Sequence, residues 1–192
     1  MDLVTLTQMK EHLNIPTGVT DYDAKVQGYI TEVSKAIETY CDRSFESLSR
    51  TETYNYYGEN SILLGQYPVT SITGVFFDTQ RVFDAESEID SGDYYLMPEE
   101  GLIGFIQRPR DYGRQILRVT YDSGYAAVPS DVQLACKLWV EHLYRVVPVS
   151  LGISSKSKQE ETVSYLDKVP DVVTKYLTDY VKGHEWNDMG AL

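Results

Sequence analysis

Apolar residues recur every three to four positions in four parts of the chain, which is the spacing of one buried stripe along a helix. The four predicted helices cover residues 5–13, 21–41, 130–147 and 170–182. Asp21 or Asp23 can cap the second helix, and Pro170 stands at the first position of the fourth. Each of these helices has one apolar stripe to bury, so we expect them to pack against one another.

Two helix starts carry the spacing of a capping box, in which two side chains satisfy free backbone N–H groups reciprocally. Thr5 is followed three residues later by Gln8, and Ser130 is followed three residues later by Gln133. Pro148 is expected to stop the third helix, because proline cannot donate a helical hydrogen bond.

Between the second and third helices the pattern changes to short alternating runs rich in Tyr, Val, Ile and Thr. Gly, Pro, Asp and Asn separate these runs, as is typical of strands joined by turns. The six predicted strands are Thr51–Tyr57, Ser61–Leu64, Ile72–Asp78, Asp93–Met97, Leu102–Ile106 and Ile116–Tyr121. The predicted fold class is therefore α+β, mainly a helical bundle with an inserted small antiparallel β region.

The change of pattern also predicts the domain organisation. Residues 1–50 and 126–182 form a helical core, and residues 51–125 form the inserted β region. The Ser-, Lys- and Glu-rich stretch 148–166 is predicted to be a flexible linker, and residues 183–192 a loose C-terminal tail.

Charge narrows the choice of partners. The 192 residues carry a formal net charge of −12, and residues 51–125 contain 12 acidic against 5 basic side chains. Such a chain is not expected to grip nucleic acid through its phosphates, because that affinity rests on Lys and Arg. No apolar run is long enough to cross a bilayer, and the N-terminus does not resemble a secretion signal.

Motifs for catalysis or metal binding are not found in the sequence. Cys41 and Cys136 lie on apolar helix faces and are interpreted as reduced core thiols, and the 3 histidines have no metal-ligand spacing. The acidic run 84–93 lacks the Gly and Glu positions of a calcium loop and is interpreted as a solvated loop. We therefore predict no catalytic, cofactor or metal site, although an enzyme built on the β region stays an alternative.

One basic cluster stands out within the sequence RPRDYGRQILR. It is either a solvated turn that balances nearby acids or a contact with an acidic partner surface or passing DNA phosphates. Tyrosine is common at protein interfaces, and the chain has 16 tyrosines. The candidate partner-contact residues are Arg108, Arg110, Arg114, Arg118, Tyr54, Tyr56, Tyr57 and Trp186.

Four phrases, in this order and spacing, resemble the head-tail connector proteins of tailed bacteriophages, also called adaptor or head-completion proteins. They are LVTLTQMKEHLNI with the helix end IETYCDRSF, the β phrase LGQYPVTSITGV, and the strand, turn and helix RVTYDSGYAAVPSDVQLACKLWVEHLY. The C-terminal VPDVVTKYLTDY is similar to the closing helix of that family.

The resemblance implies a non-enzymatic structural protein of the virion neck, made in the host cytoplasm and needing no cofactor. Its implied partners are the portal protein, a downstream neck (stopper) or tail protein, and further copies of itself in a dodecameric ring. The ring would extend the DNA channel and connect head to tail, with DNA passing without sequence-specific binding and no membrane involved. The alternative is a tail-completion protein or another phage binding module that uses the Tyr-rich β region.

Overall fold

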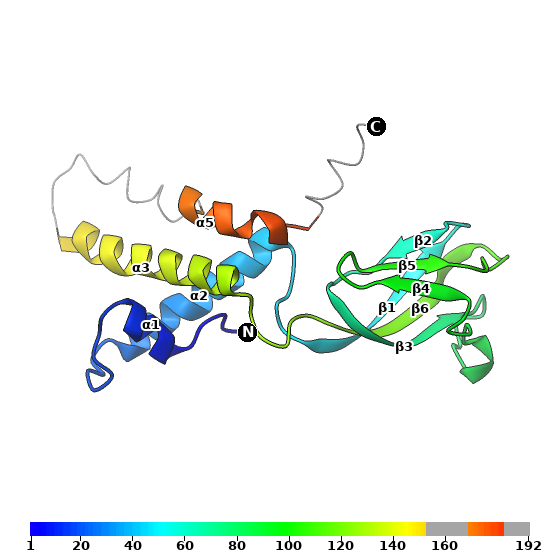
Figure 1. Ribbon diagram of the computed structural model, residues 1–192, viewed down its shortest axis with the longest axis horizontal. Coiled ribbons are helices and arrows are strands. Elements are labelled where there is room, and N and C mark those ends of the chain that lie inside the picture. Colours follow the sequence, from blue (N-terminus) through cyan, green and yellow to red (C-terminus); the bar gives the residue numbers. More distant parts are fainter. Residues whose placement is uncertain (153–168, 183–192) are drawn as a thin grey trace. The chain divides into compact units, whose positions relative to one another are not determined.

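The computed structural model describes residues 1–152 and 169–182, and it divides the chain into two compact units (Figure 1). The helical unit comprises Met1–Phe45 and the chain from Ala127 onward, and the β unit comprises Glu46–Ala126. The predicted C-terminal tail, residues 183–192, lies outside the described residues, as does most of the predicted linker.

The helical unit contains α1 (Leu6–His12), α2 (Asp23–Cys41), α3 (Ser130–Gly152) and α5 (Asp171–Leu177), followed by the 3-10 turn η2 (Thr178–Tyr180). Helix α3 packs against both α2 and α5. The predicted apolar stripes supply this core, whose buried members are Val26, Ile30, Val33 and Ile37 of α2, Val132, Cys136, Trp139 and Val140 of α3, and Val173 and Leu177 of α5. None of the helices in the described part of the chain is long and apolar enough to cross a membrane.

The two predicted capping boxes have different outcomes. The box at α1 is confirmed: the Gln8 N–H donates to Thr5 Oγ1 at 3.2 Å, and the Thr5 N–H donates to Gln8 Oε1 at 2.9 Å. At α3 the helix begins at Ser130 itself, and the Gln133 side-chain amide donates to the carbonyl of Val128 at 2.8 Å. The prediction of a reciprocal box there is wrong, because Gln133 holds the chain that enters the helix instead.

Helix ends differ from the predictions by a few residues. Helix α2 begins at Asp23 after Tyr22, which makes no side-chain cap, so the predicted Asp cap is wrong. Pro148 does not stop α3, which continues to Gly152, so the first residues of the predicted linker are helical. Pro170 directly precedes α5 rather than forming its first residue.

The β unit consists of two three-stranded antiparallel sheets, and all six predicted strands are present. The first sheet has the order β1 (Leu48–Tyr56), β6 (Gly113–Ser123), β3 (Val69–Phe77). The second has the order β2 (Ser61–Leu63), β5 (Leu102–Phe105), β4 (Tyr94–Met97). In each sheet the central strand therefore has an antiparallel partner on both sides.

The two sheets share a single core, so the β part is a unit in its own right. Its buried cluster draws on both sheets and contains Tyr56, Ile62, Leu64, Tyr67, Val69, Val75, Ile103, Phe105, Ile116, Leu117, Val119 and Tyr121. The prediction of a mainly helical bundle is therefore wrong. The strands of the first sheet are longer than predicted, and β6 has 11 residues. The two sheets bury their apolar side chains against each other and thereby form a core separate from that of the helices.

Candidate partner-contact surfaces

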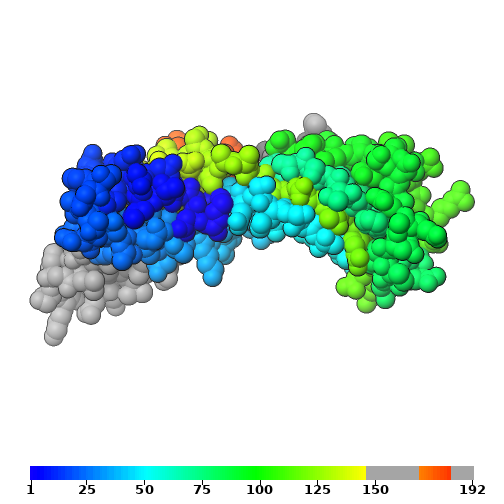
Figure 2. Space-filling view, turned by 90° about the horizontal axis from the view of Figure 1, so that it is seen from below, coloured from blue at the N-terminus to red at the C-terminus, as the bar shows by residue number. Residues whose placement is uncertain are grey.

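One exposed surface of the β unit combines aromatic and basic side chains. We call it the tip surface and define it by Tyr57, Ile106, Arg108, Arg110 and Tyr112. All five are exposed, and the exposed fractions are 55% for Tyr57, 64% for Ile106 and 65% for Tyr112. Figure 2 shows the connection 106–112, in light green, projecting at the end of this unit.

Strand pairing brings the parts of the tip surface together. Tyr56 at the end of β1 pairs with Gly113 at the start of β6, so the chain after β1 lies beside the chain before β6. Gly58 has a φ of 100° and lies under the Tyr112 ring, where an added Cβ would stand only 2.8 Å from Tyr112 Cε1. Glycine is needed at this position both for its backbone conformation and for the close approach of the ring.

The structure separates the four candidate arginines. Arg108 and Arg110 belong to the tip surface, whereas Arg114 and Arg118 lie on β6. The Arg118 guanidinium is half-buried and stacks on the ring of Phe83, with its carbon 3.9 Å from the ring centroid. Arg114 is exposed, and its carbonyl accepts a hydrogen bond from Arg81 Nε at 3.1 Å.

The candidate tyrosines also differ in their surroundings. Tyr56 is fully buried and packs edge-on against Phe77 and Phe105, with ring centroids 5.4 and 5.6 Å away. It is a core residue, so the expectation that it contacts a partner does not fit this structure. Tyr57 is exposed, and Tyr54 is half-buried. Trp186 lies outside the described residues.

Tyr54 belongs instead to a polar network centred on Glu52. One carboxylate oxygen of Glu52 accepts hydrogen bonds from the Tyr54 hydroxyl, from the Tyr121 hydroxyl at 2.8 Å and from the Gly65 N–H at 2.9 Å. Burial alone would raise the pKa of Glu52, but these hydrogen bonds and the charge of Arg50 outweigh it, so its pKa lies below the usual value. Burial, and then the Glu52 carboxylate, raise the pKa of both tyrosines.

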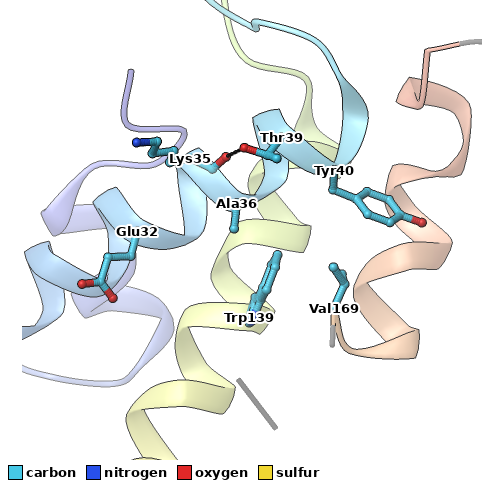
Figure 3. A pocket seen from close by; sticks show the side chains of 7 residues that line it. All are labelled: Glu32, Lys35, Ala36, Thr39, Tyr40, Trp139 and Val169. Carbon is cyan, nitrogen blue, oxygen red and sulfur yellow. Dashed lines mark hydrogen bonds between the residues drawn. The ribbon is translucent and has the colours of Figure 1, made fainter. Parts of the chain in front are cut away.

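A shallow groove of about 540 Å³ lies on the helical unit, where α2 and α3 meet the chain just before α5 (Figure 3). Glu32, Lys35, Ala36, Thr39, Tyr40, Trp139 and Val169 line it. The Trp139 ring forms part of its wall although the residue is only 7% exposed. Sequence reasoning missed the groove, because an apolar stripe along a helix does not show where facing helices leave a gap.

The two buried cysteines of the helical unit have thiols that resist ionisation. Burial raises the pKa of the Cys41 thiol to about 11 and that of the Cys136 thiol to about 12. Both cysteines are free thiols in the core. Among the described residues, no group of three or more His, Cys, Asp or Glu side chains is placed to hold a metal ion.

The predicted acidic loop, residues 84–93, is the second charged surface of the β unit, and we call it the acidic segment. Asp84 accepts a hydrogen bond from the Ser87 N–H at 3.1 Å and caps the 3-10 turn η1 (Ala85–Ser87). The Asp90 carboxylate accepts from the Gly92 N–H at 2.8 Å. Glu86 and Glu88 are exposed.

Three chains of gene transfer agent (GTA) particles are similar in structure to this chain. The neck of a native GTA particle computed with C12 symmetry contains a chain with 16% identity and a TM-score of 0.56, covering 91% of this chain and 88% of that chain. The neck of an empty GTA particle computed with C6 symmetry gives 19% identity, a TM-score of 0.54 and coverage of 75% and 79%. A chain of the virion of the native gene transfer agent particle gives 16% identity, a TM-score of 0.53 and coverage of 87% and 89%.

These structures share the fold of this chain, whereas no curated protein matches it. The pattern of one family, described as head completion protein, matches residues 2–182 and thus nearly the whole chain. The match spans both the helical unit and the inserted β unit, and it confirms the resemblance drawn from the sequence phrases. The chain belongs to the head completion protein family.

Proposed function

We propose that the chain is a structural protein of the neck of a tailed phage or phage-like particle. The observation that carries this proposal is the head completion family match over residues 2–182. The fold shared with chains from symmetric neck assemblies supports it. In the proposed role, copies form a ring beneath the portal protein, extend the DNA channel and present a surface to the next neck or tail protein.

The charge of the chain suits a wall along which DNA passes. A net charge of −12 repels phosphates, so DNA would slide through a ring of such chains without being held. The β unit has few exposed arginines, which fits a contact with another protein better than a track for DNA. The protein would be present in the host cytoplasm during assembly and in the virion neck afterwards.

Two surfaces are available for contacts in this role. The tip surface carries exposed aromatic and arginine side chains, which are enriched at the centres of protein interfaces. The groove of the helical unit offers the edge of Trp139 and the exposed Tyr40. If the exposed tyrosines of the β unit bind a tail protein instead, the chain would act as a tail-completion protein, which is the second candidate function.

The test is to locate the chain in the particle and to remove it. Particles assembled without the chain should accumulate as filled heads that lack tails, and adding the purified chain should restore joining. In electron microscopy of the complete particle, a ring between portal and tail should be visible and should bind an antibody against the chain. An antibody signal at the far end of the tail, or intact particles that contain none of the chain, would refute the neck role.

A further inference from the structure

The β unit contains no ion pair of its own. All residues of Glu46–Ala126 are described, and no ion pair joins two charged side chains among them. The four ion pairs that the described residues show all lie in the helical unit, for example Lys10 with Asp23 at 2.7 Å. Both signs of charge in the β unit are thus available to an outside partner.

The basic residues of this unit are of one type. Residues 46–126 contain six arginines and no lysine. Arginine presents a planar fork of donors that matches a carboxylate with two hydrogen bonds and is enriched in interfaces, whereas lysine is depleted there. Arg50, Arg81 and Arg118 contact other groups of the unit, and Arg114 is exposed on β6. The remaining two, Arg108 and Arg110, lie beside the exposed aromatic rings of the tip surface.

The tip surface and the acidic segment are attached to different outer strands of the first sheet, and they meet where the Ile106 N–H donates to the Asp93 carbonyl at 2.8 Å. The tip surface follows the end of β1, while the acidic segment runs along β3, where the Ile89 N–H donates to the Val75 carbonyl at 2.7 Å. Strands β1 and β3 are the two outer strands, with β6 between them. The exposed arginines of the tip surface and the exposed acids of the acidic segment therefore belong to separate connections of the chain.

We propose that the tip surface of one copy binds the acidic segment of the next copy, so that Arg108 and Arg110 face Glu86 and Glu88 across the contact. A ring needs such a head-to-tail interface, because each copy must offer two different, complementary surfaces on its two sides. Two exposed surfaces of opposite charge, attached to different strands of one unit, can meet this requirement. This inference rests on the proposed ring function and assigns its partner as a second copy of the same chain.

Charge reversal on each side separately tests the contact. We expect the full-length wild-type chain to self-associate in a concentration- and salt-dependent manner in sedimentation velocity experiments. Arg108→Glu with Arg110→Glu, or Glu86→Arg with Glu88→Arg, should each weaken that association at least about tenfold. A matched control is Glu99→Arg with Glu100→Arg, which reverses two exposed acids of the same unit outside both surfaces and should leave association unchanged.

Restoration by mixing is the decisive outcome. In a mixture of the two reversed variants, every contact between unlike copies again joins opposite charges, so alternating assemblies should form, and a chain carrying all four changes should associate with itself. All four residues are exposed, so thermal unfolding should be unchanged in each variant. Association that is unaffected by reversal, a mixture that does not associate, or a wild-type chain that stays monomeric would each overturn the inference.

Loss of binding to another virion protein with self-association intact would also overturn the inference, because it would assign the tip surface to that protein. The particle experiments decide the neck role independently. A chain found in the neck whose copies meet through other surfaces would refute only this contact. A chain absent from the neck that still associates through these residues would refute only the neck role.

Discussion

Replacing Glu52 by Gln should weaken the β unit by an amount that depends on pH. Three donors converge on one oxygen of this carboxylate, from Tyr54, Gly65 and Tyr121. A hydrogen bond to a charged group contributes about 1.5–3 kcal/mol and a neutral one about 1 kcal/mol. Glu52 is only half-buried, so we use the lower end of this range, and three bonds that each weaken by about 0.5 kcal/mol give a loss of about 1.5 kcal/mol at pH 7.

The direction of the pH dependence follows from the pKa of Glu52, which is lower in the folded chain than its ordinary value of 4.5. A group of this kind adds stability that is fully present above the unfolded pKa and is lost as pH falls through the folded pKa. The Gln variant has no such contribution. The difference in stability between wild type and variant should therefore be largest near neutral pH and should shrink below about pH 4.5.

Hydrogen exchange of the amides of β1 and β6 measures the free energy of opening of this unit by itself, which global denaturation of a two-unit chain does not. Glu100→Gln is the matched control, because Glu100 is exposed and outside the network, and it should change stability by less than about 0.5 kcal/mol. A difference between wild type and Glu52→Gln that stays constant from pH 7 to below pH 4 would refute the charge-based account of the network.

Three further substitutions or treatments test the packing. Trp139→Ala should lower the free energy of opening of the helical unit by about 3–5 kcal/mol, measured by hydrogen exchange of the α2 and α3 amides, and a loss under about 1 kcal/mol would contradict its role in the core. Gly124→Ala should cost at least about 1 kcal/mol, because Gly124 has a φ of 110° and a Cβ there would collide with the Glu46 carbonyl; Gly18→Ala, with open space around it, is the control. Iodoacetamide should modify Cys136 at pH 7.5 far more slowly in the native chain than in urea, because burial raises its pKa to about 12; equal rates would contradict this.

The sequence predicted local structure well where one side chain pattern decides it. The six strands were found because alternation and turn residues mark them, and the box of Thr5 with Gln8 was found because its two bonds span only three residues. The cap at α3 was predicted wrongly, because the Gln133 side chain can donate as well as accept. It donates a hydrogen bond to the Val128 carbonyl in the turn before the helix. The balance between helix and sheet was also missed, since pairing distant strands into two sheets depends on contacts that no short window contains.

The candidate surface was predicted only in outline. Clustering in the sequence identified the arginines, but it could not show that Arg118 stacks on Phe83 while Arg108 and Arg110 stay exposed. Tyr56 ends β1 with its ring in the core, whereas Tyr57 follows the strand and is exposed. The Glu52 network was invisible because its donors come from three separate segments of the chain.

The polar groups in and near the core of this chain each keep one protonation state, whereas the exposed charges are available for contacts. Both properties suit a protein that assembles with others. The core thiols stay neutral because burial raises their pKa values, and the half-buried Glu52 carboxylate stays ionised near neutral pH because its hydrogen bonds lower its pKa. The exposed charges of the β unit have no ion-pair partners inside it. Exposed charges held on a rigid two-sheet core can meet a partner with little loss of conformational entropy, which favours specific contacts between copies over chemistry within one copy.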